Sequence, residues 1–112
     1  MRGSGLHRGY VAHAGLLVAR CADEFREAKF EQRRIGLHHI CFRARSREDV
    51  DRVHEFLREN GVKIVHAPED GPWAPGYYSV LFEDPDGIRL EVNFVPGKGN
   101  LDPKIKLPIE PP

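Results

Sequence analysis

The chain has 112 residues, which is enough for one domain with a single modest core. Its 17 basic and 17 acidic residues cancel to a formal net charge of zero, so no global electrostatic field favours nucleic acid, a membrane surface or a polyanionic substrate as a partner. Two local arginine clusters, Arg33-Arg34 and the alternating set Arg43, Arg45 and Arg47, have acidic residues around them and are interpreted as solvated faces.

The cysteines and the apolar runs bear on the cellular compartment. Cys21 and Cys41 form no CxxC pair and no disulfide framework, so we interpret them as reduced thiols of a cytosolic protein. Nothing approaches the roughly 18 apolar residues of a membrane span, and the N-terminus lacks a secretory apolar region. The sequence therefore predicts a cytoplasmic protein with no membrane partner.

Residues 1–35 carry weak structural signals. The segment 11–19 (VAHAGLLVA) predicts a lone buried strand, which Gly15 weakens. Residues 22–34 are rich in helix formers, but Phe25 and Phe30 are poorly spaced for one apolar stripe. That composition indicates a short helix or an ordered linker.

The signals sharpen from residue 36. Residues 36–44 alternate as a strand does, with Ile40, Phe42 and Ala44 on one face. The opposite face carries His39, Cys41 and Arg43.

A helix follows this strand. Ser46, with Asp49 three residues later, predicts a helix N-cap with a capping-box-like partner. The apolar stripe consists of Val50, Val53 and Leu57. Asn60-Gly61 predicts the end of the helix, because glycine adopts the left-handed conformation without strain.

The remainder of the chain predicts three strands and a tail. In chain order, these are a short strand at 62–66, a proline- and glycine-rich loop at 68–76, a strand at 77–83, a tight turn at 84–87 and a strand at 88–95. Residues 97–112 are proline-rich and predict an extended tail. Residues 36–96 therefore predict one α+β module of the βαβββ type.

Two polar side chains far apart in the sequence are expected to meet on this module. In the last strand, Glu91 lies on the face opposite Leu90 and Val92. If the predicted strands 36–44 and 88–95 both turn their apolar faces to the same helix, His39 and Glu91 project together from the opposite face of the sheet. A neutral imidazole and a carboxylate on a rigid surface are the beginning of a divalent metal site.

The strand with Gly36-Leu37-His38-His39, the capped helix and the run 81–91 (LFEDPDGIRLE) together resemble one module of the vicinal oxygen chelate superfamily. This superfamily includes glyoxalase, extradiol dioxygenases, and fosfomycin and bleomycin resistance proteins. The resemblance implies a curled mixed sheet with the helix on its convex face, and two such modules paired as a cup around a divalent ion. It places His39 and Glu91 at metal-ligand positions and makes residues 1–35 the remnant of a truncated first module with its linker.

Each of these residues also has a simpler interpretation. His39 could be a strand histidine hydrogen-bonded to the backbone, and Glu91 could form a structural ion pair with Arg43 or Arg89. If His39 binds a metal, Asn93 or a backbone carbonyl is the expected acceptor for its other ring nitrogen.

The remaining histidines are not expected to be principal metal ligands. His38 is expected to pack under the helix, and His13 is a weak candidate ligand. The others are expected at the surface: His7, His54 and His66.

The expected substrate pocket lies beside the metal-ligand pair. Its predicted residues are Cys41, Arg43, Trp73, Tyr77, Arg89 and Asn93. Cys41 is interpreted as a wall residue, because a nucleophilic thiol needs a lowered pKa and a base. Trp73, Tyr77 and Tyr78 predict either a substrate wall or an aromatic cluster that closes the core.

The resemblance implies a metal-dependent lyase, isomerase or dioxygenase that chelates a small oxygen-rich organic substrate through Zn, Ni, Mn or Fe. Glu91 is the candidate catalytic residue, able to act as a base only if it leaves the metal. The alternatives are a non-catalytic small-molecule binder of the resistance type, or a truncated half-module without independent activity. Because a single module leaves its cup and strand edges open, we expect a homodimer.

Overall fold

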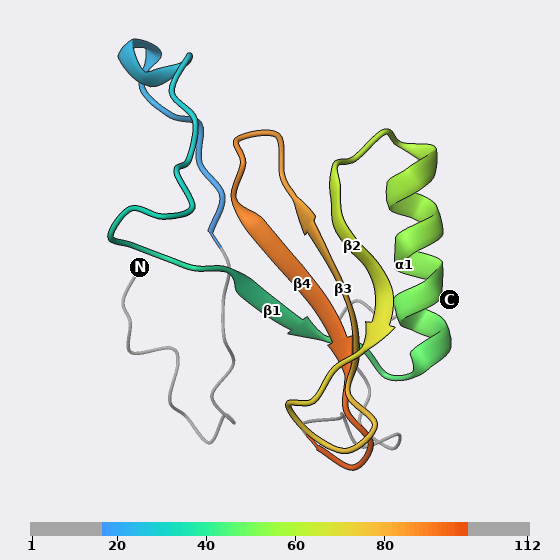
Figure 1. The fold of residues 1–112 in the computed structure, drawn as a ribbon. Helices are drawn as coiled ribbons and strands as arrows, with labels where there is room; N and C mark the ends of the chain where they lie inside the picture. The colour runs from blue at the N-terminus through green and yellow to red at the C-terminus, as the bar shows by residue number, and fades with distance from the viewer. Residues whose placement is uncertain (1–16, 99–112) are drawn as a thin grey trace, which may run out of the picture.

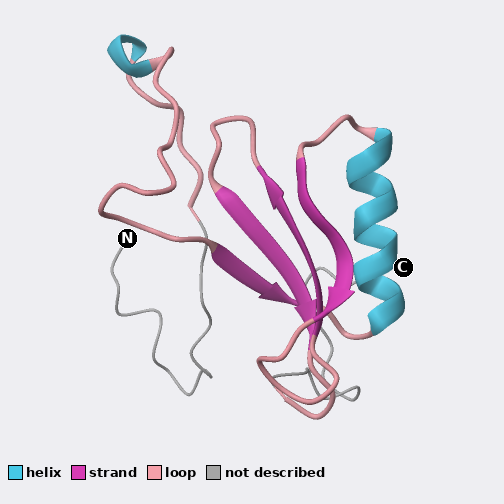
Figure 2. Cartoon of the chain, viewed as in Figure 1, coloured by secondary structure: helices cyan, strands magenta, loops and turns pink. Residues whose placement is uncertain are grey.

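The computed structural model describes residues 17–98. The elements, in chain order, are a short 3-10 helix (Asp23–Phe25), β1 (Ile40–Arg43), α1 (Arg47–Glu59), β2 (Ile64–Asp70), β3 (Tyr78–Glu83) and β4 (Arg89–Phe94) (Figure 1). The four strands form one open mixed sheet, with the helix on one of its faces (Figure 2). The predicted α+β class and the βαβββ order are confirmed.

The sheet has the strand order β1-β4-β3-β2, so the first and last strands of the module lie side by side. β1 runs parallel to β4, whereas β4 with β3 and β3 with β2 are antiparallel. The register places Cys41 beside Glu91 and Leu81 on the other side of Glu91. β4 is therefore the central strand on which the polar face is assembled.

α1 begins and ends as the sequence predicts. Ser46 Oγ accepts a hydrogen bond of 3.0 Å from the backbone N–H of Asp49, which satisfies one of the free donors of the first turn. Gly61, directly after the terminal turn, has a φ of 68°, a conformation that favours glycine.

The core between α1 and the sheet is small. Among the described residues, Val50 of α1 and Val80 of β3 have no exposed surface, and Leu57 and Val95 are also buried. Val80 lies opposite Val92 in the register, so the helix-facing sides of β3 and β4 are apolar as predicted. A core of this size holds the sheet against a single helix.

β2 extends further than predicted. The strand runs through Pro68 to Asp70, although the proline was expected to begin a loop. β2 is an edge strand and its pairing with β3 shifts register between His66 and Glu69, and both features allow a proline without the loss of a ladder hydrogen bond.

The packed position predicted for His38 is wrong. α1 packs against β2, β3 and β4 and does not reach β1, so this helix does not cover the segment that leads into the edge strand. His38 is exposed, and Phe42 retains 39% of its surface although its side chain lies on the helix-facing side.

The segment before β1 is linked to the far end of the module. Among residues 22–34, only the short 3-10 helix is regular. The N–H of Phe30 donates to the carbonyl of Asp86 at 2.8 Å, and Lys29 Nζ donates to the carbonyl of Pro85 at 3.1 Å. The segment therefore contacts the turn between β3 and β4, as an ordered linker does.

Some predictions fall partly or wholly outside the described residues. Of the predicted strand 11–19, residues 17–19 are described and are not in a strand. His7, His13 and the tail from residue 99 lie outside the described range. Within residues 17–98, no helix combines the length and the apolar character that crossing a membrane requires.

Candidate metal centre

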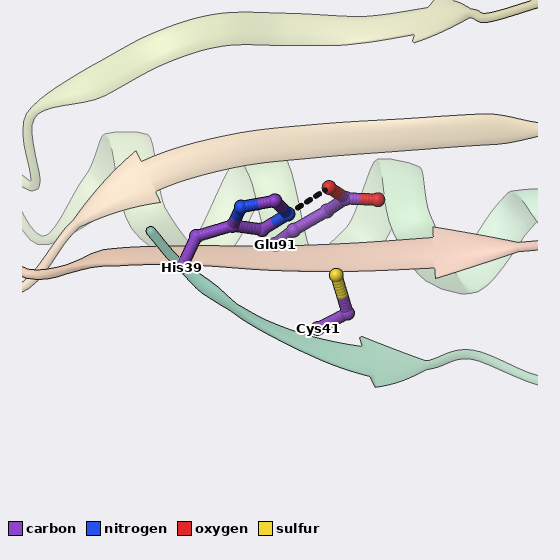
Figure 3. A group of neighbouring side chains, drawn as sticks. All are labelled: His39, Cys41 and Glu91. Carbon is purple, nitrogen blue, oxygen red and sulfur yellow. Dashed lines mark hydrogen bonds and ion pairs between the residues drawn. The ribbon is translucent and has the colours of Figure 1, made fainter. Parts of the chain in front are cut away.

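Three side chains with metal-binding atoms converge on the sheet face opposite α1 (Figure 3). Cys41 projects from β1 and Glu91 from the neighbouring position of β4, while His39 precedes Cys41 by two residues and shares its side. The alternation of a strand places His39 and Cys41 on one face, and the parallel register adds Glu91.

The three donors are close enough to share one ion. His39 Nε2 lies 3.0 Å from Glu91 Oε1, and the nitrogen, sulfur and carboxylate oxygen all lie within 4.8 Å of one another. Tetrahedral ligands at the usual bond lengths lie roughly 3.3–3.8 Å apart. A divalent ion therefore fits if the His39–Glu91 pair opens by a few tenths of an ångström and the widest donor separation closes by about 1 Å, and the chemistry of the donors suits a transition metal.

Glu91 is held by a set of donors. Glu91 as a residue is 7% exposed, and its Oε2 accepts hydrogen bonds from the phenol of Tyr77 and, at 2.8 Å, from Asn93 Nδ2. Burial alone would raise the pKa of Glu91, but the donors Tyr77 and Asn93 and the nearby His39 outweigh it and hold the pKa below its ordinary value. The side chain is thus kept as an anion.

The same carboxylate affects two neighbouring groups. Burial and the hydrogen bond to Glu91 raise the pKa of Tyr77 to about 12, so the phenol remains a donor at neutral pH. Burial and the charge of Glu91 also raise the pKa of the Cys41 thiol. A raised pKa does not activate a thiol as a nucleophile.

The second nitrogen of His39 has a partner that the sequence did not predict. His39 Nδ1 lies 2.7 Å from Nδ1 of His38, and the two rings meet edge to face. Asn93, the predicted acceptor, instead bonds Glu91 because both lie on β4 and share one side. His38 is therefore the group that holds the His39 ring on its Nδ1 side.

The ion pair proposed between Glu91 and an arginine is not formed. Arg43 donates to Asn93 Oδ1 at 2.6 Å and to the carbonyl of Lys98. Arg89 Nε lies 3.8 Å from Oε2 of Glu83, its neighbour in the β3–β4 register. The carboxylate of Glu91 thus interacts with the imidazole of His39 and with the neutral donors Tyr77, Asn93 and Cys41.

A hollow of about 540 Å³ opens beside the donor group. Its lining residues are His38, His39, His66, Glu69, Asp70, Gly71, Pro72, Trp73, Tyr77, Ser79, Leu81 and Glu91.

Of the predicted pocket residues, Trp73 and Tyr77 line this hollow. The others, Cys41, Arg43, Arg89 and Asn93, do not line it. Trp73 is 76% exposed, so the alternative in which it helps to close the core is wrong.

Sequence reasoning missed five polar residues of this hollow: His38, His66, Glu69, Asp70 and Ser79. His66 lies beside Leu81, which is next to Glu91 in the register. Alternation within β2 gave no signal for this, because the register shift after His66 changes which side chains face the hollow.

Comparison with known proteins gives concordant matches. A family model described as the Glyoxalase/Bleomycin resistance protein/Dioxygenase superfamily matches residues 6–92. A candidate glyoxalase from Bacillus halodurans, known as a crystal structure, is 36% identical and has a TM-score of 0.55, covering 67% of this chain and 57% of that one. A glyoxylase/bleomycin resistance protein/dioxygenase domain from Frankia sp. EAN1pec is 28% identical with a TM-score of 0.53, covering 60% of this chain and 50% of that one.

A relative in Bacillus subtilis (strain 168), the uncharacterized protein YqjT, is 33% identical over 79 residues. The match covers 69% of this chain and 61% of the relative. The chain therefore spans only 50% to 61% of the length of these relatives.

Proposed function

Because the chain belongs to the Glyoxalase/Bleomycin resistance protein/Dioxygenase superfamily, we propose that it is a metal-dependent enzyme whose divalent ion is held by His39 and Glu91. The observation that carries this proposal is the 3.0 Å approach of His39 Nε2 to Glu91 Oε1 on the sheet face opposite α1. When bound, a divalent ion supplies a Lewis acid that polarises the oxygens of a small substrate.

The surrounding residues prepare the two ligands. Tyr77 and Asn93 fix Glu91 through Oε2 and leave Oε1 directed at His39. The Nδ1 contact with His38 orients the His39 ring, as the outer partner of a ligand histidine does. With its pKa lowered, Glu91 serves as a ligand and is a weak base at neutral pH.

The hollow beside the donors supplies the substrate position. Trp73 and Tyr77 offer aromatic surface along one wall, and the ring of His39 and the carboxylate of Glu91 reach the same hollow. A small organic molecule with two adjacent oxygens would place them at the metal while its carbon skeleton contacts the aromatic wall. We therefore propose a small oxygen-rich substrate that chelates the ion.

Zinc titration of the purified chain tests the metal site. We expect one equivalent of Zn²⁺ to bind per chain with a dissociation constant in the micromolar range or below, because both ligands are already in place. The measurement is calorimetry on chelator-treated protein, followed by elemental analysis after gel filtration. Binding weaker than that of an unfolded control peptide would contradict the enzyme proposal.

We also propose that the chain forms a two-fold homodimer, in which a second copy covers the open polar face. The support is the edge position of β1, the exposure of Leu37 near that edge, and the coverage of only 50–61% of the relatives' length. Light scattering at micromolar concentration should give about twice the chain mass of 12.7 kDa. A mass of one chain would contradict this arrangement.

A second candidate function is non-catalytic binding of a small molecule. The wide exposure of Trp73 at the rim of the hollow favours it, because an exposed indole is a strong contact surface for an organic ligand. Such a binder would retain its ligand after metal removal, whereas the enzyme proposed above would lose it. Ligand binding to chelator-treated protein therefore separates the two functions.

A further inference from the structure

We propose that Cys41 is a third metal ligand, which completes a His-Cys-Glu site and makes it selective for a thiophilic ion such as Zn²⁺ or Co²⁺. This inference rests on the proposed metal function and adds a donor to it. It assigns to Cys41 a role distinct from that of a wall residue, since the thiol does not line the hollow.

The position of Cys41 carries the argument. Its sulfur lies within 4.8 Å of both the His39 nitrogen and the Glu91 oxygen, and Figure 3 shows it on the same side of the strands as both. Cys41 is paired directly with Glu91 in the β1–β4 register, so two neighbouring strands fix the distance between their side chains. The three donors thus come from a rigid sheet.

Among the described residues, the Cys41 thiol forms no disulfide, and its side-chain partner is Glu91, the proposed co-ligand. Cys41 and Cys21 are both free, so no disulfide occupies the sulfur. Arg43, the nearest cation along β1, is engaged by Asn93 and the carbonyl of Lys98. Cys41 is accessible from the sheet edge, and an ion entering the site therefore meets it.

The donor set determines the preferred metal. One imidazole, one thiolate and one carboxylate, with a fourth position left open, match the pattern of three protein ligands in catalytic zinc sites. Binding breaks the S–H bond and forms a metal–sulfur bond, and the proton passes to water. Thiolate ligands favour Zn²⁺ and Co²⁺, whereas Mg²⁺ and Mn²⁺ prefer oxygen donors.

Cobalt titration tests the third ligand. We expect the wild-type chain to develop an intense near-ultraviolet thiolate-to-cobalt charge-transfer band that saturates at one equivalent per chain. The Cys41→Ser variant should lose this band and bind Co²⁺ more weakly by roughly 100-fold or more, because loss of a mere outer partner already costs about tenfold to a hundredfold. Cys21→Ser is the matched control, because it removes the chain's other thiol, and it should retain the band.

A second measurement uses the unmodified protein. Zn²⁺ should protect Cys41 but not Cys21 from alkylation, which peptide mass mapping can locate, whereas Mg²⁺ should protect neither thiol. This result does not depend on the folding of a variant.

The outcomes separate the two proposals. Tight binding of one Co²⁺ without a charge-transfer band would overturn the role of Cys41 and leave the His39–Glu91 site intact. A band that persists in Cys41→Ser would also overturn it. Failure of Zn²⁺ and Co²⁺ to bind at all would overturn the proposed function itself.

Discussion

Replacing His39 by alanine is expected to lower the affinity for Zn²⁺ by roughly 100-fold or more. Loss of an outer partner of a metal ligand already costs about tenfold to a hundredfold, and a ligand contributes more than its partner. The variant would leave Oε1 of Glu91 without the nitrogen that now lies 3.0 Å away. Competition titration against a zinc chelator of known affinity measures the change.

His66→Ala is the matched control for this experiment. His66 lines the same hollow but is not one of the three converging donors. Its affinity for Zn²⁺ should lie within a few-fold of that of the wild-type chain. Equal zinc affinity in all three proteins would show that His39 is no ligand, and the hydrogen-bonded histidine would then be the correct interpretation.

Replacing Leu57 by alanine is expected to destabilise the fold by about 2–4 kcal/mol, through lost apolar burial and the cavity that remains. Leu57 is one of four buried apolar residues among those described, and α1 is the one described helix that covers the sheet. Small domains are stable by about 5–15 kcal/mol in total, so this loss is a large fraction. Urea unfolding at a fixed protein concentration measures it.

The neighbouring residue provides the control for the helix. Phe56 is 62% exposed, and Phe56→Ala removes a larger side chain from the same helix without opening a core cavity. We expect a change below about 1 kcal/mol for this variant. If Phe56→Ala proved as costly as Leu57→Ala, the packing of α1 on the sheet would differ from the one described.

The parts of the fold set by local rules could be predicted from the sequence. Ser46 and Gly61 mark the ends of α1 because capping depends on the residues of one turn. The common side of His39 and Cys41 follows from strand alternation. The approach of Glu91 to them needed one further assumption, namely that both strands present their apolar faces to the same helix.

The parts of the fold that depend on strand order and register could not be predicted from the sequence. Tyr77, directly before β3, reaches Glu91 because β4 returns antiparallel along β3, and His66 reaches the hollow because β2 lies beyond β3. His38 was misplaced for a related reason: the sequence shows that a helix exists, but not that it stops short of β1. These relations are long-range, and no local pattern encodes them.

The parallel neighbours β1 and β4 join the two ends of the module, since His39 and Glu91 are 52 residues apart in the chain. An ion held between them would close a long loop, in the manner of a cross-link that restricts the unfolded chain. Resistance to unfolding would then rise with the supply of that ion, because binding to the native state alone adds its free energy to folding. The catalytic ion would then also stabilise the fold, because it would join the first and last strands of the module.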